Sequence, residues 1–367
     1  MSQITLHTTI ERTPKVMQIE GMFDITPEQI STTTIADNIP DLTTKDWNIG
    51  LIVGASGTGK STIAKHHFGK LLDTQLTWDN NKSLIDSFPE QMSIKQITAL
   101  LSSVGFSSPP AWLRPFNTLS NGEQFRVSMA RLIAENPKMV VVDEYTSVVD
   151  RNVAKIGSTA LAKTIRKQNT QFVAVSCHYD ITEWLQPDWI YEPATGVFTW
   201  ECLRQRPPIN LEIIKTTTTA WNLFAQHHYL DHNLNRSAQV YVALINGQPA
   251  ALCAVLTMMH PKVKEARRIS RIVTLPDYQG VGIGNTLLNT VAGAYMADGK
   301  KMYITTSHPA MIQSLNKSRN WAMNRKPSRV AAVGKTSTAR LATSKKRITA
   351  SFTYAGQPNY EAHALLA

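Results

Sequence analysis

The sequence has few cysteines, no long hydrophobic run and, in its second half, few acidic residues. Its three cysteines, Cys177, Cys202 and Cys253, are odd in number and widely spaced, which fits neither a disulfide framework nor a zinc-binding pattern. The N-terminus has no apolar signal-peptide core, and no stretch approaches the ~20 apolar residues of a membrane-spanning helix. We therefore expect a cytoplasmic protein with reduced thiols that is neither secreted nor inserted into a membrane.

Charge is divided unevenly along the 367 residues. Residues 1–200 carry 17 Lys and Arg against 20 Asp and Glu, whereas residues 201–367 carry 21 against 7. The net charge of +11 therefore comes entirely from the second half. A positive field attracts polyanions and speeds their encounter, so nucleic acid is the leading partner of this half. A solvated basic surface that only keeps the chain soluble is the alternative that charge alone leaves open.

A glycine-rich loop follows the apolar residues 49–53, which predict a buried strand. The letters GASGTGKS have the spacing G-x-x-x-x-G-K-S and lead into a helix that begins near Lys60. Such a loop turns its N–H groups toward phosphates, while the lysine meets the β- and γ-phosphates and the serine hydroxyl binds Mg²⁺. We expect ATP and Mg²⁺ to bind here. The expected nucleotide contacts are Gly54, Ser56, Gly57, Gly59, Lys60, Ser61 and Thr62.

Two adjacent carboxylates end a second apolar run. Residues 139–142 predict a strand, and Asp143 and Glu144 follow it. Because successive strand residues point to opposite sides, the pair can divide its work. Asp143 would hold the magnesium ion together with Ser61, and Glu144 would polarise the attacking water. Solvated acids at a strand end are the alternative for this pair taken alone.

Residues 119–124 (LSNGEQ) precede the helix that leads to this second strand. The hydroxyl of Ser120 and the N–H of Gly122 at a helix N-terminus would form an anion site. A capping box between Ser120 and Glu123 explains the same letters equally well. Farther on, His178 follows an apolar strand, a position where a lone histidine is more often structural.

In this order and spacing, the motifs resemble those of the ABC ATPase superfamily. The resemblance implies that residues 119–124 are the signature, that residues 147–150 (SVVD) are the D-loop and that His178 is the switch histidine. Glu144 and His178 would then be catalytic. It also implies an ATP-dependent head-to-tail homodimer, in which the signature of one chain closes on the nucleotide of the other.

One feature departs from the pattern of ABC transporters. No clear Q-loop glutamine follows the strand-like segment 82–88; Gln91 is the nearest glutamine, and Asp86 is a possible replacement. Since the Q-loop links a transporter's nucleotide domain to its membrane partner, its absence disfavours a transport subunit. Phe23 and Trp47 are candidates for the aromatic side chain that stacks on adenine, although a place in the hydrophobic core fits each better.

Two consecutive prolines at 207–208 mark the expected domain boundary. We expect an ABC-type ATPase domain over residues 1–203 and a linker over 204–210. After the linker the pattern predicts a helix, two strands joined by an Asn-Gly hairpin turn at 246–247, and a third strand.

A second glycine-rich loop, residues 279–284 (QGVGIG), separates this third strand from an amphipathic helix. A further strand and a helix over residues 309–323 follow. Bare N–H groups at a helix start bind pyrophosphate, but similar glycines occur in plain strand-to-helix turns and in dinucleotide-binding folds.

This loop and the order of elements resemble the GNAT acyltransferase superfamily. The resemblance implies an acyltransferase core over residues 211–325, completed by a basic segment over residues 326–367. It also implies that acyl-CoA, for example acetyl-CoA, is the donor. The implied donor contacts are Gln279, Gly280, Val281, Gly282 and Gly284. The catalytic base is open among His228, Asp231, Tyr278, Tyr303 and His308, each of which is more often structural.

The expected fold class is α/β, with an N-terminal ABC-type P-loop NTPase domain and a C-terminal GNAT-like α+β acyltransferase domain. Such a chain resembles ABC-type ATPases fused to a predicted acetyltransferase in prokaryotes and their phages, and its second half resembles the phage Mom-type branch that modifies adenine in DNA. Residues 324–347 hold eight basic residues and no acidic one, which fits either a phosphate backbone or a solvated tail. We expect an ATPase and N-acyltransferase that acts on nucleic acid. The alternatives are an ATP-gated nucleic-acid clamp without acyl transfer and, less favoured, the nucleotide-binding subunit of a transporter.

Overall fold

The computed structural model describes residues 2–25, 30–72, 76–200, 209–229, 232–259, 263, 265–329 and 347–366. The chain forms two compact units, each of which gathers segments that are far apart in the sequence. Unit 1 consists of Met1–Thr77, Leu132–Val149 and Ala162–Pro207, and unit 2 consists of Trp78–Arg131, Asp150–Leu161 and Pro208–Ala367. The domain boundary expected at 204–210 stays a prediction, since residues 201–208 lie outside the described residues.

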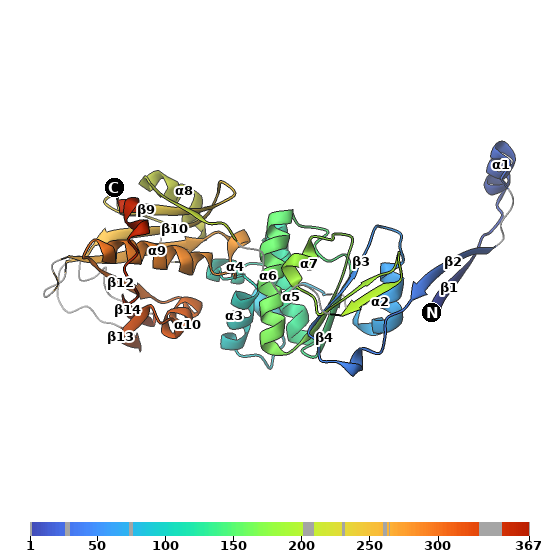
Figure 1. Ribbon diagram of the computed structural model, residues 1–367, viewed down its shortest axis with the longest axis horizontal. Helices are drawn as coiled ribbons and strands as arrows, with labels where there is room; N and C mark the ends of the chain where they lie inside the picture. The colour runs from blue at the N-terminus through green and yellow to red at the C-terminus, as the bar shows by residue number, and fades with distance from the viewer. Residues whose placement is uncertain are drawn as a thin grey trace. The chain divides into compact units, whose positions relative to one another are not determined.

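A five-stranded sheet in the order β4-β5-β3-β6-β7 forms the centre of unit 1. Figure 1 labels its strands β3 and β4. The first four strands run parallel, and β7 pairs with β6 in the antiparallel direction. Every residue of β3 is buried, as the unbroken apolar run predicts. The predicted strands at 49–53 and 139–142 are confirmed. The strands are β3 (Ile49–Val53), β4 (Met139–Val142), β5 (Gln171–Ser176), β6 (Trp189–Glu192) and β7 (Val197–Trp200).

Aromatic side chains fill the core of unit 1 beside β3. The Trp47 ring packs edge-on against the Trp189 ring, with 5.5 Å between centroids, and its indole N–H donates to the Leu42 carbonyl at 3.1 Å. Trp189 itself lies against Gly50, where a Cβ atom would come within 2.0 Å of the indole ring. Trp47 is therefore a core residue, and Gly50 supplies the space that Trp189 occupies.

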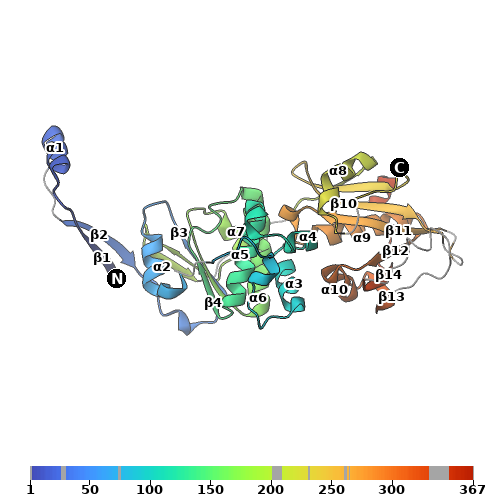
Figure 2. The ribbon, with the colours of Figure 1, turned by 180° about the vertical axis from the view of Figure 1, so that it is seen from behind.

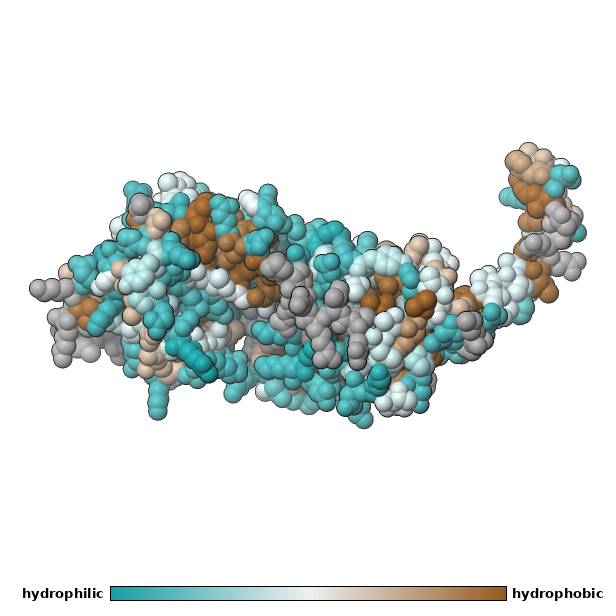
Figure 3. Space-filling view, viewed as in Figure 1, coloured by the Kyte–Doolittle hydropathy of each residue, from teal (hydrophilic) through white to brown (hydrophobic). Residues whose placement is uncertain are grey.

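A two-stranded antiparallel ribbon, β1 (Ser2–Thr9) with β2 (Ile30–Asp37), begins unit 1. Helix α1 (Pro14–Phe23) lies between these strands in the chain and has no buried residue. Figure 3 shows hydrophobic side chains gathered at the surface of α1, among them Met22 and Phe23, both 66% exposed. The expectation that Phe23 belongs to a hydrophobic core is wrong, because its helix buries no side chain.

Unit 2 contains a seven-stranded sheet in the order β13-β14-β12-β11-β10-β9-β8. In the described part of this sheet β11 and β12 pair in parallel, and the other neighbouring strands pair in the antiparallel direction. The predicted Asn-Gly hairpin turn is confirmed, since Asn246 and Gly247 have φ of 50° and 75° between β9 and β10. The strands are β8 (Glu212–Thr216), β9 (Gln239–Ile245), β10 (Gln248–Thr257), β11 (Ala266–Thr274), β12 (Lys301–Thr306), β13 (Trp321–Ser328) and β14 (Thr349–Tyr354).

Helices complete both units. Helix α2 begins at Lys60, as predicted. Figure 2 shows the same ribbon from behind, with α3, α5 and α6 labelled. The remaining α-helices are α2 (Lys60–Phe68), α3 (Ile94–Ser103), α4 (Pro109–Trp112), α5 (Asn121–Glu135), α6 (Arg151–Gln168), α7 (Ile181–Leu185), α8 (Trp221–Phe224), α9 (Ile283–Ala297) and α10 (Pro309–Lys317).

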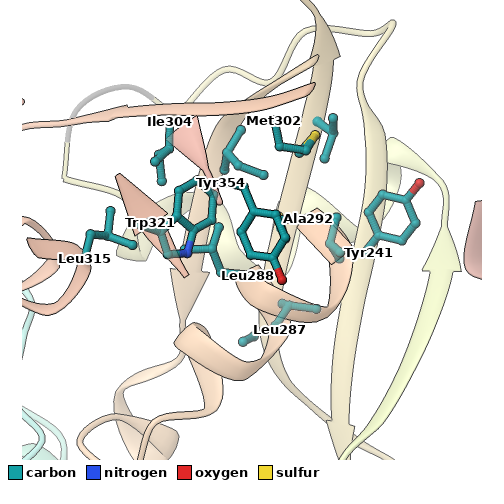
Figure 4. Close-up of a cluster of buried hydrophobic side chains, with 14 of the residues drawn as sticks. Tyr241, Leu287, Leu288, Ala292, Met302, Ile304, Leu315, Trp321 and Tyr354 are labelled. Atoms are coloured by element: carbon teal, nitrogen blue, oxygen red, sulfur yellow. The ribbon is translucent and has the colours of Figure 1, made fainter. Parts of the chain in front are cut away.

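Helix α9 covers the core of unit 2. Leu287, Leu288 and Ala292 of α9 are fully buried against sheet residues such as Met302 and Ile304 (Figure 4). The Tyr241 hydroxyl lies 2.9 Å from the Tyr295 hydroxyl, which satisfies two polar atoms inside this core. Burial of this face fixes the start of α9, and with it the glycine-rich loop that precedes the helix.

Two expected elements differ from the structure. The helix predicted over residues 309–323 ends at Lys317, and Trp321 begins β13. Trp321 is buried, and its indole N–H donates to Asn289 Oδ1 at 2.8 Å, so its tertiary contacts overcome a local helical pattern. The strand-like segment 82–88 instead contains a 3₁₀ helix, Leu84–Ser87, closed by a hydrogen bond from the Ser83 hydroxyl to Asp86.

No helix in the described part of the chain has both the length and the apolar character that a membrane crossing requires. Cys177 is exposed and Cys253 buried, and both are unbonded thiols; Cys202 lies outside the described residues.

We expect Gly50→Ala to lower the free energy of unfolding by about 2 kcal/mol, because the new methyl group must displace the Trp189 ring. Denaturant unfolding followed by circular dichroism measures the change. Gly21→Ala is the matched control, since a Cβ at Gly21 meets nothing within 4 Å. Equal unfolding midpoints for the two variants would contradict the packing described for β3.

Candidate functional site

The carboxyl ends of β3, β4 and β5 meet at one edge of the sheet in unit 1. Because these strands run parallel and β5 lies between the other two, the segments that follow them are neighbours. The glycine-rich loop follows β3, Asp143 and Glu144 follow β4, and His178 comes two residues after β5. The structure thus brings together three of the motifs that the sequence singled out.

Ser176, the last residue of β5, connects these three segments. Its carbonyl accepts the N–H of Gly54 at 3.3 Å, and its hydroxyl donates to the Tyr145 carbonyl at 3.0 Å. The same hydroxyl accepts the N–H of His178 at 3.2 Å. Ser176 is only 1% exposed. Sequence reasoning missed this residue, although a polar residue ending the apolar run FVAVS is a usable signal.

The glycine-rich loop has the backbone shape that phosphate binding requires. Gly57 and Gly59 have φ of 82° and 87°, in the left-handed region that favours glycine. A Cβ at Gly59 would lie 2.6 Å from Ile35, whereas a Cβ at Gly57 would meet nothing within 4 Å. The loop therefore packs closely against Ile35 at Gly59 and has free space beside Gly57.

The other expected nucleotide contacts lie along this loop and the first turn of α2. The Lys60 ammonium donates to the Ala55 carbonyl of its own loop at 2.7 Å. Ser56 and Ser61 are exposed, and Thr62 is half-buried. A lysine that folds back onto its own glycine-rich loop fits the triphosphate of ATP, and an exposed serine at the start of α2 fits a hydroxyl ligand of Mg²⁺.

The two acids after β4 have different surroundings. Asp143 is half-buried, and its Oδ1 accepts the N–H of Glu144 at 2.8 Å. Glu144 is exposed and has φ of 50°, a left-handed conformation that is uncommon outside glycine. Thr146 follows with φ of 67°. The strand ends at Val142 and Glu144 is left-handed, so strand alternation does not set the directions of the two carboxylates. The division of work between Asp143 and Glu144 stays a prediction.

In unit 2, the letters LSNGEQ form a capping box at the start of α5. The Ser120 hydroxyl accepts the N–H of Glu123 at 3.3 Å, and Glu123 Oε2 accepts the N–H of Ser120 at 3.0 Å. Ser120 is exposed, whereas Gly122 is buried. The capping interpretation is confirmed. The role of Ser120 and Gly122 as a signature for ATP stays a prediction.

The second glycine-rich loop connects β11 to α9 in unit 2. Gly282 has φ of 97° and precedes the first residue of α9 with no side-chain cap, and a Cβ there would meet nothing within 4 Å. Gly284 is close to Thr274, whose Oγ1 would lie 2.6 Å from an added Cβ. The positive end of a 15-residue helix with open N–H groups fits the pyrophosphate of an acyl-CoA.

The other residues expected to contact the donor, Gln279, Gly280 and Val281, also contact residues outside the second glycine-rich loop. The Gln279 side chain accepts the N–H of Ser107 at 2.6 Å and donates to the Thr274 carbonyl at 2.9 Å. A Cβ at Gly280 would lie 2.8 Å from the Cα of Gly105. Val281 packs against the hydrophobic core. Gln279 and Gly280 are thus engaged by the segment between α3 and α4.

A polar cluster lies where β12 ends. The Tyr229 and Ser307 hydroxyls are 2.8 Å apart, and His308 Nε2 lies 3.1 Å from the Ser107 carbonyl oxygen. Burial lowers the pKa of His308, opposed by its hydrogen bond to Ser107. His308 is therefore neutral near pH 7, as a general base must be. Sequence reasoning missed Tyr229.

The other candidate bases are less suited to the role. His228 is buried against Trp221, with 5.7 Å between ring centroids. Burial, followed by the charge of Asp277, raises the pKa of Tyr278. Tyr303 is half-buried on β12, and Asp231 lies outside the described residues.

Two family models match parts of the chain. The model of the ABC transporter family matches residues 69–147, which include residues 119–124 and the tandem acids and begin after the glycine-rich loop. The model of the acetyltransferase (GNAT) family matches residues 180–315, which include the second glycine-rich loop.

Individual proteins resemble parts of the chain. The lipoprotein-releasing system ATP-binding protein LolD of Rickettsia prowazekii (strain Madrid E) is 26% identical over 179 residues, covering 38% of this chain and 79% of LolD. A dimeric post-hydrolysis structure of the ATP-binding cassette MJ0796 with ADP and Pi has a TM-score of 0.36 at 16% identity, covering 48% of this chain and 93% of that one. An IAA acetyltransferase from Bacillus cereus ATCC 14579 has a TM-score of 0.30 at 14% identity, covering 40% and 99%. The two family models support an N-terminal ABC-type NTPase domain and a C-terminal domain of the GNAT acetyltransferase fold.

We expect Ser176→Ala to lower kcat for ATP hydrolysis by about 10-fold while ATP binding persists, because displacement of catalytic groups slows chemistry more than it weakens phosphate binding. Steady-state hydrolysis and nucleotide binding measure the two effects. Thr195→Ala removes a hydroxyl from the turn between β6 and β7 and serves as the control. An unchanged kcat in Ser176→Ala would show that Ser176 does not position the site.

Proposed function

We propose that the protein is an ATP-binding and ATP-hydrolysing dimer whose acyltransferase domain acts on nucleic acid in the cytoplasm. The observation that supports ATP hydrolysis best is the meeting of the glycine-rich loop, the tandem acids and the His178 segment around Ser176. The ABC and GNAT matches in one chain support the pairing of the two activities.

In this proposal each residue of the nucleotide site has a distinct role. Lys60 leaves the Ala55 carbonyl to meet the β- and γ-phosphates, and Gly54, Ser56, Gly57, Gly59 and Thr62 complete the loop around them. Ser61 and Asp143 hold Mg²⁺. Glu144, exposed beside Asp143, positions the attacking water, and His178 supports the γ-phosphate. Bound ATP with Mg²⁺ supplies the phosphoryl group that is transferred to water.

The proposed dimer is head-to-tail. Ser120 and Gly122 of one copy complete the nucleotide site of the second copy, and Ser120 is exposed at the start of α5 as this role requires. Its hydroxyl is shared with the capping box at Glu123, so contact with a phosphate replaces or supplements that hydrogen bond. ATP binding closes the dimer, and hydrolysis releases it.

The proposed acyl transfer takes place in unit 2. The N–H groups at Gly282 and Gly284 hold the pyrophosphate of an acyl-CoA such as acetyl-CoA, with Gln279, Gly280 and Val281 beside them. An amine of the acceptor attacks the thioester carbonyl, so that a C–N bond forms and the C–S bond breaks. We assign the proton from the amine to His308, which burial keeps neutral, and the proton required by the thiolate to solvent.

The proposed acceptor is a nucleic acid, and within that class we favour adenine in DNA, as in the phage Mom-type enzymes that the second half resembles. The support is the concentration of charge, 21 basic against 7 acidic residues after residue 200. Arg325 and Lys326 on β13 belong to this basic half. Phosphate contacts of this kind hold a nucleic acid in place without reading its sequence.

One observation favours a second function, an ATP-gated nucleic-acid clamp without acyl transfer. The Gln279 amide is already bonded to Ser107 and Thr274, so it is not free for a donor in this arrangement.

Several curated relatives are named as ATP-binding proteins of transport systems. A transport role has weaker support here, because Asp86, the possible Q-loop replacement, accepts a hydrogen bond from Ser83 within its own 3₁₀ turn.

Glu144→Gln should retain ATP binding but lower turnover by about 100-fold or more, because the amide cannot polarise water as a carboxylate does. The variant should also form a dimer when ATP is added. Hydrolysis assays and sedimentation with ATP and Mg²⁺ provide the two readouts. Glu183→Gln changes an exposed acid on α7 and should behave as the parent protein does. Normal turnover in Glu144→Gln would remove Glu144 from the mechanism.

Duplex DNA should become acylated when the protein is incubated with ATP and isotope-labelled acetyl-CoA, as detected by mass spectrometry of the nucleosides. DNA binding should weaken steeply with salt, with a log–log slope of about −0.9 for each phosphate neutralised. Salt-sensitive binding without any labelled nucleoside would favour the clamp. Weak binding that salt does not change would eliminate nucleic acid as the partner.

A further inference from the structure

The segment between α3 and α4, Val104–Ser108, lies against the acyl-donor loop of the same unit. Gly105 and Gly280 meet backbone to backbone, and both have positive φ, of 88° and 91°. A Cβ at Gly105 would come within 2.5 Å of the Gln279 carbonyl oxygen, and one at Gly280 within 2.8 Å of the Gly105 Cα. Contact this close requires glycine on both sides. Figures 1 and 2 both show α4 next to the loop that leads into α9.

Ser107 bridges the two sides of a gap in the sheet. Strands β11 and β12 pair over only four residues, Ala266–Ile269 with Lys301–Ile304, and are unpaired with each other beyond that. The donor loop follows β11, and His308 follows β12. The Ser107 N–H donates to Gln279 at 2.6 Å, while its carbonyl lies 3.1 Å from His308 Nε2. Ser107 therefore binds both Gln279, which the proposed function assigns to the acyl donor, and His308, which it assigns as the base.

Arg126 on α5 holds this arrangement in place. It is 2% exposed. Its guanidinium donates to the Gly105 carbonyl at 2.8 Å, to the Asp277 carbonyl at 2.6 Å and to the Pro276 carbonyl. Burial lowers the pKa of Arg126 to about 10, which leaves it charged near neutral pH, and the carboxylates of Asp277, Glu123 and Asp150 oppose the shift. Removing a buried cation that serves three carbonyls leaves those acceptors unpaired.

The start of α5 also touches the donor side directly. A Cβ at Gly122 would lie 2.9 Å from Asp277 Oδ1. Gly122 and Ser120 form the signature that the proposed dimer brings to the nucleotide of a second copy, and Arg126 follows them on the same helix. A shift of α5 on dimer closure would thus be transmitted to Pro276–Tyr278 and to the Gly105–Gly280 contact without any intervening element.

We propose that Val104–Ser108 is a plug seated across the gap between β11 and β12, and that Arg126 latches the plug so that ATP-driven movement of α5 opens the acyl-donor site. This inference rests on the proposed function. In the seated state, the plug occupies Gln279 and His308 and opposes donor binding. When the plug is released, Gln279 can turn to the donor and His308 to the acceptor. ATP binding and donor binding then favour the same open state, which is the condition for positive coupling.

The first test measures acetyl-CoA affinity of the full chain with and without ATP and Mg²⁺, in the slow-hydrolysing Glu144→Gln background. ATP should tighten acetyl-CoA binding on the order of 10-fold. Arg126→Gln should tighten it to a similar extent without ATP, and ATP should add little more. Arg114→Gln, which changes an exposed arginine two residues after α4, is the matched control. Equal acetyl-CoA affinity in all of these states would overturn the plug and leave acyl transfer intact.

The second test needs no donor and no latch variant. Hydrogen exchange in the peptide that contains Ser107 should accelerate when ATP and Mg²⁺ are added to Glu144→Gln, because opening breaks the hydrogen bond from the Ser107 N–H to Gln279. Unchanged exchange would refute the plug even if Arg126→Gln proves unstable. If acetyl-CoA binds in no state, acyl transfer is lost as a function, and the exchange result alone decides whether α5 controls this loop.

Discussion

The position of β5 between β3 and β4 is the constraint on which the proposed nucleotide site depends. Parallel strands deliver their carboxyl ends to one edge, and a central β5 places Ser176 within hydrogen-bond reach of the segments that follow all three. Each of these segments begins immediately after a buried strand, so packing of the apolar core determines where Lys60, Glu144 and His178 can lie. The positions of these three side chains therefore depend on the order in which the buried strands pack in the sheet.

In unit 2, two backbone segments approach each other closely, and one buried cation, Arg126, stabilises the contact. Glycines at 105 and 280 allow two main chains to touch, and Arg126 satisfies the carbonyls that the contact brings together. A lysine could not donate to three acceptors in fixed directions as a planar guanidinium does. Helix α5 thus contacts the segment before the second glycine-rich loop through short, directional hydrogen bonds from Arg126.

The sequence predicted most of the elements because their signals are local. The apolar runs at 49–53 and 139–142, the start of α2 and the Asn-Gly turn all follow from patterns within a few residues. The end of α10 was not predictable in this way, because Trp321 is drawn into β13 by burial and by Asn289, which lies 32 residues earlier. Ser176 and Ser107 were missed for the same reason. Their roles depend on partners that only the folded sheet brings near.

Retention of ATP with Mg²⁺ by the purified full chain tests the central claim most directly. Equilibrium dialysis should show saturable, magnesium-dependent binding by the unaltered protein and loss of most of that binding in Lys60→Ala. The circular dichroism spectra of the two proteins should be the same. Failure of the unaltered protein to bind ATP, or equal binding by both proteins, would contradict the assignment of the loop after β3 as the nucleotide site.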